Sequence, residues 1–287
     1  MTLIEAINSA SGKLTAAGIS NARRDAEVLL CHALGRDRAW LLAHIREALD
    51  EGPREVFERT VERRARREPL QYITGKQEFW GLDFLVTPEV LIPRPETELI
   101  IEAALHRLQE RNKPLGIIDL CTGSGCIAVS LATELPQARL IATDRSAKAL
   151  AVARENACRH GVSDRIRFLE GDLFEPLKRF DRSGQADIIV SNPPYIASGD
   201  REKLQPEVRD FEPALALFAG PDGTELHRPI IETAHAFLTS GGALIMEMGI
   251  GQARALEQAI RETRVYDAPD VLTDLAGIER VVVAVKK

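Results

Sequence analysis

The sequence contains few of the residues on which metal centres and disulfide frameworks depend. Among its 287 residues there are 4 cysteines and 6 histidines. The cysteines form no Cys-x-x-Cys pair, and the histidines occur singly, without the close spacing of zinc ligands. We therefore expect thiols that pack in the interior rather than a metal site or a disulfide. Nothing in the sequence favours a Ser-His-Asp triad.

Long apolar runs are also missing. No stretch approaches the ~18 consecutive apolar residues that a membrane helix needs. Residues 1–5 lack the basic start and apolar core of a secretion signal. Hydrophobic residues make up 45% of the chain and charged residues 28%, which is typical of a globular protein. We expect a cytoplasmic protein with no membrane partner.

The chain also lacks a net positive charge, because its 37 Lys and Arg are outnumbered by 43 Asp and Glu, for a net charge of −6. Nucleic-acid-binding domains usually carry a basic surface, so wholesale nucleic-acid binding is not expected. The first 75 residues are nonetheless slightly basic, with 12 Lys and Arg against 11 Asp and Glu. A short segment there is either a solvated helix face with ion pairs or a docking surface for a charged partner. Its arginines are Arg59, Arg63, Arg64, Arg66 and Arg67.

Three regions with different patterns divide the chain. Apolar residues at helical spacing predict a small helical domain over residues 1–70, with a fourth helix beginning at Pro53. We assign this domain to substrate recognition. Residues 71–88 mix aromatic and branched side chains around Gly81, which predicts a β-hairpin linker. Residues 89–287 form the third region.

Strands and helices alternate in this third region, which predicts an α/β domain with a mostly parallel sheet and helices on both faces. Two of the helices are expected at about 225–238 and 252–261. The strands are expected at residues 115–120, 140–143, 166–169, 186–190, 243–248 and 281–285.

A glycine loop follows the first of these strands. In open α/β sheets, ligands bind beyond the carboxyl ends of the strands. Glycines there let the backbone approach a ligand closely, and the helix that follows offers unpaired N–H groups. A Gly-x-Gly pair alone is weak evidence, but its place between a strand and a helix strengthens it. The residues of this candidate cofactor loop are Cys121, Thr122, Gly123, Ser124 and Gly125.

Acidic residues follow the next two strands. Asp144 is suited to grip a ribose diol, and Asp172 could accept a hydrogen bond from an adenine amino group, with Leu173 against the ring. A dinucleotide would prefer a third glycine, although the Ala128 that stands there is tolerated. Hydride transfer is not favoured because no His, Tyr or Lys is positioned as a proton partner at the rim formed by Asn192. A nucleoside with a short charged tail fits better, and S-adenosylmethionine is the obvious candidate.

The strand at 186–190 stops against Asn192, Pro193, Pro194 and Tyr195. Two prolines cannot continue a strand ladder, so the backbone must leave the sheet as a stiff rim. The Asn192 side-chain carbonyl and the Pro193 backbone carbonyl could each accept one N–H of a planar NH₂ group, while Tyr195 covers its flat face. That arrangement would draw the nitrogen toward tetrahedral geometry and aim its lone pair at a methyl donor.

A second stiff loop carries Arg94 between Pro93 and Pro95. Because prolines restrict the backbone, this loop presents Arg94 in a fixed direction. We expect Arg94 to share in holding the substrate; a plain domain linker is the alternative, although such linkers are usually polar and flexible.

Together these motifs resemble class I S-adenosylmethionine-dependent methyltransferases. With residues 92–98 (Ile-Pro-Arg-Pro-Glu-Thr-Glu) and 211–215 (Phe-Glu-Pro-Ala-Leu), the whole chain is similar to the HemK-type release-factor glutamine N5-methyltransferases. The resemblance implies a Rossmann-like domain with a mostly parallel seven-stranded sheet. It also implies methylation of the glutamine in the Gly-Gly-Gln motif of peptide chain release factors, with these proteins as partners and no direct nucleic acid.

Residue by residue, the resemblance implies cofactor contacts at 121–125, Asp144, Leu173 and Asn192, and a glutamine pocket at 192–195. Two positions depart from the family pattern. Cys121 stands where the family often has glycine, and Leu173 stands where an aromatic ring may occur.

Two other functions stay open at this stage. The Asn-Pro-Pro-Tyr motif is shared with adenine-N6 nucleic-acid methyltransferases, so by itself it fixes only methylation of an amino nitrogen. Such an enzyme would need a basic groove with interleaved aromatic residues, which the acidic second half does not favour. A non-enzymatic adaptor that binds S-adenosylmethionine is the other alternative, and the intact Asn192 argues against it.

Overall fold

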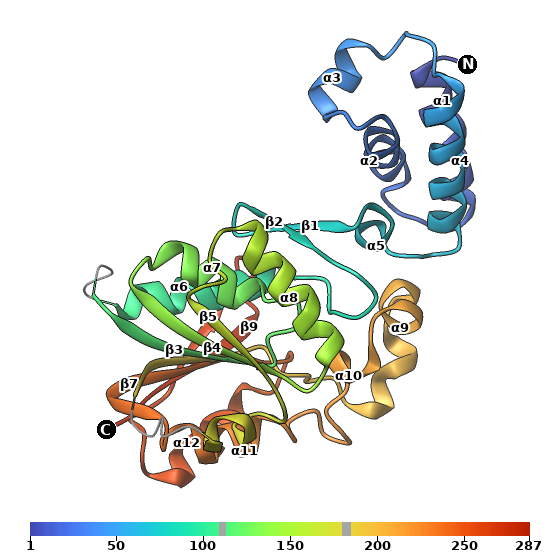
Figure 1. Cartoon of the computed structure of the whole chain (residues 1–287). Coiled ribbons are helices and arrows are strands. Elements are labelled where there is room, and N and C mark those ends of the chain that lie inside the picture. Colours follow the sequence, from blue (N-terminus) through green and yellow to red (C-terminus); the bar gives the residue numbers. More distant parts are fainter. Residues whose placement is uncertain (109–112, 180–184) are drawn as a thin grey trace. The chain divides into compact units, whose positions relative to one another are not determined.

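The computed structural model describes residues 1–108, 113–179 and 185–287, which form two compact units (Figure 1). The helical unit comprises Met1–Lys76 together with Gln205–Phe211. The sheet unit comprises the described parts of Gln77–Leu204 and Glu212–Lys287. The return of residues 205–211 to the helical unit has no counterpart in the sequence prediction.

The helical unit packs amphipathic helices around its own core of leucine, isoleucine and phenylalanine side chains, including Ile7, Leu30 and Phe57. A capping box between Thr2 and Glu5 starts its first helix. The helices are α1 (Leu3–Ala16), α2 (Ala22–Leu34), α3 (Arg38–Ala43), α4 (Glu51–Ala65), α5 (Leu70–Thr74) and α9 (Pro206–Phe211). The predicted start of α4 at Pro53 is wrong by two residues, because proline is tolerated within the first helical turn.

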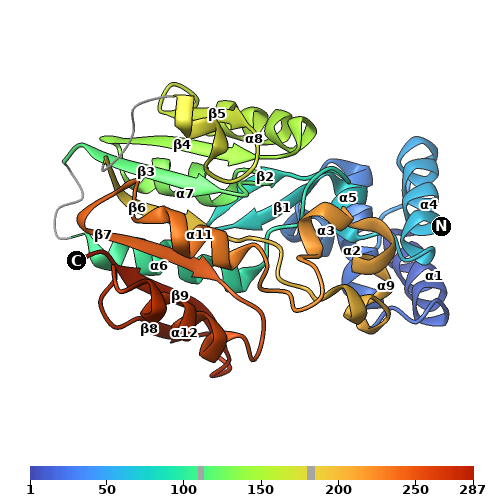
Figure 2. The same cartoon turned by 90° about the horizontal axis from the view of Figure 1, so that it is seen from below.

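The sheet unit is built on seven strands in the order β5-β4-β3-β6-β7-β9-β8 (Figure 2). The first five strands of this order, β5, β4, β3, β6 and β7, pair in parallel, and β9 is antiparallel to its neighbours β7 and β8. The mostly parallel seven-stranded sheet is therefore confirmed. The strands are β3 (Leu115–Leu120), β4 (Ala138–Asp144), β5 (Ile166–Glu170), β6 (Ala186–Ser191), β7 (Leu238–Glu247), β8 (Asp270–Thr273) and β9 (Glu279–Val285).

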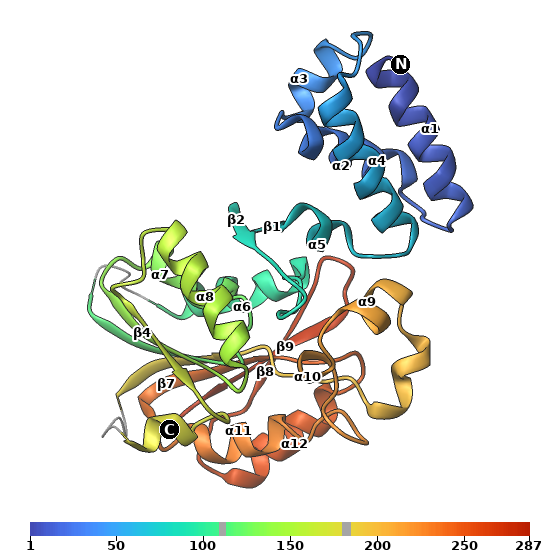
Figure 3. The same cartoon turned by 45° about the vertical axis from the view of Figure 1, so that its right-hand side comes forward.

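Helices cover both faces of this sheet (Figures 1 and 3). Successive strand residues point to opposite faces, so Ile117 joins the core under one helix layer and Ile118 the core under the other. One layer consists of α6 (Glu98–Arg107), α7 (Cys126–Glu134) and α8 (Ala147–Arg159), and the other includes α11 (His227–Ala234) and α12 (Ala253–Thr263). The shorter elements are η1 (Pro95–Thr97), η2 (Glu175–Arg179), η3 (Ser198–Lys203) and α10 (Ala214–Leu217).

The predicted hairpin is confirmed as β1 (Lys76–Phe79) and β2 (Leu82–Leu85), which form a two-stranded sheet. Its turn places Trp80 at φ 54° and Gly81 at φ 68°. A two-residue turn with positive φ at both positions matches the twist of the flanking strands. Trp80 occupies this conformation despite its side chain, and its ring packs against the core of the sheet unit.

Three elements show the largest differences from the prediction. Strand β7 begins at Leu238 rather than at 243. The prediction missed its first residues because those up to Gly242 are of types common in loops, and the pairing of β7 with β6 shifts register there. Strand β8 was not predicted, since it is four residues long and has no buried side chain. Helix α11 is shorter at both ends than the predicted 225–238. No helix in the described ranges is long and apolar enough to cross a membrane.

Candidate active site

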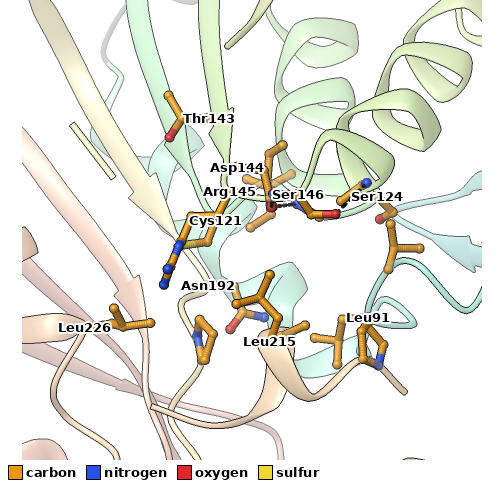
Figure 4. Close-up of a pocket in the computed structure, with 18 of the residues that line it drawn as sticks. Leu91, Cys121, Ser124, Thr143, Asp144, Arg145, Ser146, Asn192, Leu215 and Leu226 are labelled. Carbon is orange, nitrogen blue, oxygen red and sulfur yellow. Dashed lines mark hydrogen bonds between the residues drawn. The ribbon is translucent and has the colours of Figure 1, made fainter. Parts of the chain in front are cut away.

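A cavity of about 440 Å³ lies in the sheet unit, lined by residues that follow four neighbouring parallel strands. Figure 4 shows Ser124 and Asp144 on one side of it, and Asn192, Leu215 and Leu226 on the other. The carboxyl ends of parallel strands meet at one edge, and that is where ligands bind in this class of sheet. The structure thus brings together candidate residues as far apart in the sequence as Arg94 and Pro194.

The loop after β3 depends on left-handed backbone conformations. Gly123 has φ 56° and Gly125 has φ 79°. A Cβ atom on Gly125 would lie 3.0 Å from the Ala153 Cβ, so close packing of α7 on α8 also requires glycine there. A Cβ on Gly123 would meet nothing within 4 Å, which leaves open space beside the cavity. Cys121 has φ 59° although it carries a side chain. Cys121, which stands where the family often has glycine, therefore occupies a backbone conformation that favours glycine.

Asp144, the last residue of β4, is held by the backbone of two loops. Its Oδ2 accepts a hydrogen bond from the Gly123 N–H and its Oδ1 one from the Ser146 N–H, both at 2.9 Å. Burial raises the pKa of this carboxyl, and the backbone hydrogen bonds oppose the rise. The side chain is consequently fixed in direction before any ligand arrives.

The two candidates after β5 differ in exposure. Leu173 lines the cavity at φ 45°, and its carbonyl accepts a hydrogen bond from the Thr143 hydroxyl at 3.1 Å. Asp172 also lines the cavity, but half of its side chain is exposed and its Oδ1 lies 3.8 Å from the Arg145 Nε. Asp172 therefore stands at the rim of the cavity.

The Asn-Pro-Pro-Tyr residues divide into two pairs. Asn192 and Pro194 line the cavity, whereas Pro193 and Tyr195 are not among its lining residues. The Asn192 Nδ2 donates a hydrogen bond to the Thr97 hydroxyl at 3.1 Å. The Tyr195 hydroxyl donates to the Glu247 Oε1 at 3.0 Å, so its polar end is directed to a buried carboxylate. Burial, reinforced by the nearby Glu247, raises the pKa of this phenol.

Arg94 lines the cavity and has an internal partner that the sequence did not suggest. Its guanidinium donates to the Glu212 Oε1, and the Glu212 Oε2 accepts a hydrogen bond from the Ile92 N–H at 3.3 Å. Burial raises the pKa of the Glu212 carboxyl, and Arg94 opposes that rise. The pair ties the proline-braced loop to the segment that starts at Pro213 and also lines the cavity.

Sequence reasoning missed Thr97, Glu212 and Glu247. Glu247 is 2% exposed and ends β7 at the same edge of the sheet as the other candidates. A signal existed in its case, because a lone carboxylate inside the apolar run 243–248 has no reason to be buried for stability alone. The described residues contain no group of three or more His, Cys, Asp or Glu side chains arranged to hold a metal ion.

Comparison with known proteins places this site in a family. Residues 5–75 match the model of the PrmC N-terminal domain, and residues 97–207 match that of the methyltransferase small domain. The release factor glutamine methyltransferase of Geobacter sulfurreducens is 45% identical over 98% of this chain and 95% of its own length. That of Moorella thermoacetica is 43% identical over 100% and 99%. The chain belongs to the release factor glutamine methyltransferase family.

Membership of the release factor glutamine methyltransferase family confirms the resemblance on which the sequence analysis relied, and it makes the chain a methyltransferase. The fold has independent support from a solved structure. The catalytic domain of hMettl16 matches with a TM-score of 0.58 at 19% identity, over 77% of this chain and 80% of that one. At that identity the match speaks for the α/β methyltransferase fold alone.

Proposed function

We propose that this chain methylates the side-chain amide nitrogen, N5, of the glutamine in the Gly-Gly-Gln motif of peptide chain release factors. Full-length relatives with this activity in their names support the substrate. The observation that carries the proposal is the position of Asn192, which lines the same cavity as the strand-end residues of β3, β4 and β5. An amide acceptor for a substrate N–H thus borders the space available to a methyl donor.

We further propose that the methyl donor is S-adenosylmethionine. The residues present suit it, because open space beside Gly123, the fixed carboxylate of Asp144 and the apolar Leu173 line one cavity. Residues 121–124, Asp144, Asp172, Leu173 and Asn192 would hold it, whereas Gly125, the last candidate of the loop, packs against Ala153 and is not among the lining residues. This compound supplies a methyl group on a sulfonium, which an aligned nitrogen lone pair can attack.

The protein's part in the reaction is positioning. A planar amide nitrogen is a poor nucleophile because its lone pair is delocalised. In this proposal Asn192 Oδ1, at the cavity lining, accepts one N–H of the substrate amide. The Pro193 carbonyl would accept the other and the Tyr195 ring would cover the flat face, although neither residue is among those that line the cavity. Oriented attack of this kind corresponds to an effective molarity of ~10⁵–10⁸ M. No base is needed before transfer, since the product cation loses its proton to water.

We propose that the helical unit and Arg94 share in holding the protein substrate. Within the arginine cluster, Arg63 pairs with Glu68, and both Arg64 and Arg67 pair with Glu207. Arg59 and Arg66 are exposed, so the docking hypothesis narrows to these two. Charge reversal of both should raise KM for the release factor with kcat unchanged. Arg24→Glu, at an exposed position of α2, is the matched control.

One experiment separates the proposed function from adenine methylation, which the relatives do not favour. The protein is incubated with S-adenosylmethionine carrying a labelled methyl group and either a purified release factor or DNA. Label on the release factor supports the proposal. Label on DNA and none on the release factor would overturn it.

A further inference from the structure

The Asn192 amide begins a hydrogen-bonded chain that runs through Thr97, another residue lining the cavity, to Glu247, which is not among the lining residues. Its Nδ2 donates to the Thr97 Oγ1 at 3.1 Å, and the Thr97 hydroxyl donates to the Glu247 Oε2 at 2.6 Å. On the other side of the same carboxylate, Oε1 accepts from the Tyr195 hydroxyl at 3.0 Å. One buried acid therefore contacts Tyr195 directly and reaches Asn192 through a single hydroxyl.

When Glu247 is ionised, the direction of every bond in this chain is fixed, because a carboxylate can only accept hydrogen bonds. Both hydroxyls must therefore donate to Glu247. The single proton of Thr97 is then used, so its Oγ1 has only lone pairs to offer Asn192. The Thr97 Oγ1 lone pairs can bind only the NH₂ end of the Asn192 amide, because the carbonyl end is another acceptor.

Two members of this chain have little contact with water. Thr97 and Glu247 are both 2% exposed. Thr97 is fixed at the end of η1, immediately before α6, and Glu247 is fixed at the end of β7. The Glu247 backbone carbonyl accepts a hydrogen bond from the buried His227 at 2.8 Å. A hydrogen-bonded network without solvent has few alternative arrangements.

We propose that Glu247 and Thr97 are positioning residues that set the rotation of the Asn192 amide, so that its Oδ1 faces the cavity as an acceptor. The inference rests on the proposed amide methylation. A substrate NH₂ presents two donors, and an Asn192 turned by half a rotation would present its own NH₂ to them. Two donors facing each other form no bond, so the reactive geometry depends on Thr97, which lines the cavity together with Asn192, and on Glu247, which is not among the lining residues.

The neighbouring Tyr195 depends on the same acid. Its backbone carbonyl accepts a hydrogen bond from the Gln252 Nε2 at 3.0 Å, and its hydroxyl is bound by Glu247. Tyr195 is therefore held both at its backbone and at its hydroxyl. Glu247 thus fixes the acceptor that Asn192 provides and the ring beside it with one side chain.

Isosteric variants of Thr97 test the proposal. Thr97→Val removes the hydroxyl and keeps the shape, whereas Thr97→Ser keeps the hydroxyl and is the matched control. Thr97→Val should lower kcat on a release factor on the order of 10–100-fold, with KM and the dissociation constant of S-adenosylmethionine little changed. Thr97→Ser should stay within about threefold of the wild type. Thermal unfolding of both variants serves as the control for whether each is folded.

A double-mutant cycle distinguishes positioning from general damage. If Thr97 acts through Asn192, then Thr97→Val should add no further loss of kcat to the Asn192→Ala variant. Losses that multiply in the double variant would overturn the proposal, as would a Thr97→Val enzyme with wild-type kcat. A wild-type enzyme that leaves the release factor unmethylated would instead refute the proposed function, so the two failures are distinguishable.

Discussion

Two glutamates of this protein, Glu207 and Glu247, are shielded from water but have opposite kinds of hydrogen-bond partner. Glu207 on α9 is bound by two cations of the helical unit, Arg64 at 3.1 Å and Arg67 at 2.7 Å. Burial raises its pKa, but hydrogen bonds from the backbone and from these arginines outweigh burial, so the pKa lies below the usual value. Glu247 in the sheet unit is hydrogen-bonded by two neutral hydroxyls instead, and burial raises its pKa.

The difference in pKa fits the roles that we propose, a structural one for Glu207 and a positioning one for Glu247. A carboxylate whose pKa is lowered on folding stabilises the folded protein at neutral pH, and one whose pKa is raised costs stability there. Glu207 holds α9 in the helical unit at a net gain. Glu247 is tolerated at a net cost, which is common where a charge orients groups at an active site.

The largest expected effect concerns the residue at the end of the Glu247 chain. Asn192→Ala removes the proposed acceptor for the substrate N–H, and we expect kcat to fall about 10²–10³-fold. S-adenosylmethionine should still bind measurably, because residues of three other strand ends line the cavity. Single-turnover kinetics and calorimetric titration measure the two quantities. Unchanged turnover would rule out the amide-clamp mechanism.

Exchanging the two glutamates for neutral residues should separate stability from activity. Glu207→Ala leaves the buried Arg64 without one of its two acidic partners, and we expect a loss of about 1–3 kcal/mol in the free energy of unfolding of the helical unit. Glu58→Ala, which breaks an exposed pair with Arg54, should leave the free energy of unfolding nearly unchanged.

Glu247→Gln should behave in the opposite way. It removes a buried charge, so stability at neutral pH should be equal or higher, while kcat falls because an amide can donate to Thr97 and let Asn192 turn. Denaturant unfolding and steady-state kinetics on the same preparations make the comparison. A Glu247→Gln variant that is strongly destabilised and fully active would invert the roles assigned to the two acids.

The same chain predicts a dependence on pH. The groups around Glu247 are the hydroxyls of Thr97 and Tyr195, the charges of Glu96 and Arg280, and His227 on its backbone carbonyl. Burial foremost, with Glu96, raises the Glu247 pKa above the usual value. As the pH falls through that raised pKa, Glu247 gains a proton, can donate to Thr97, and no longer fixes the amide. We expect kcat to decline on the acid side at a higher pH than an ordinary carboxyl would cause.

The control for this decline is the Glu247→Gln variant, which should lack it. Burial also raises the pKa of Asp119 to about 7, so a decline caused by Asp119 would persist in that variant. The pH profile of kcat for the two proteins separates these sources. An identical acid limb in both would show that Glu247 does not control the amide.

The smallest expected effect lies in the cofactor loop. Cys121 has φ 59°, where a side chain is strained and glycine is not. Cys121→Gly relieves this strain but adds backbone freedom to the unfolded chain, so we expect a net stabilisation of less than about 1 kcal/mol. Thermal unfolding measures it. A clear loss of stability would mean that packing of the thiol outweighs the strain.

The sequence predicted the elements whose patterns are local. The strand at 115–120, its glycine loop and the Asn-Pro-Pro-Tyr rim are each defined by a short run of consecutive residues. The structure has the strand at the predicted bounds. The partners of Arg94 and Asn192 could not be predicted in this way. Glu212 is 118 residues from Arg94, and Thr97 is 95 residues from Asn192. Such contacts follow from the crossing order of the strands rather than from spacing along the chain.

The most direct test of the account is mass spectrometry of a release factor after incubation with this protein and S-adenosylmethionine. The account predicts one added methyl group on the glutamine of the Gly-Gly-Gln motif, formed by the wild type and by Thr97→Ser and strongly reduced with Asn192→Ala. A methyl group on another residue, or equal methylation by the wild type and Asn192→Ala, would contradict it.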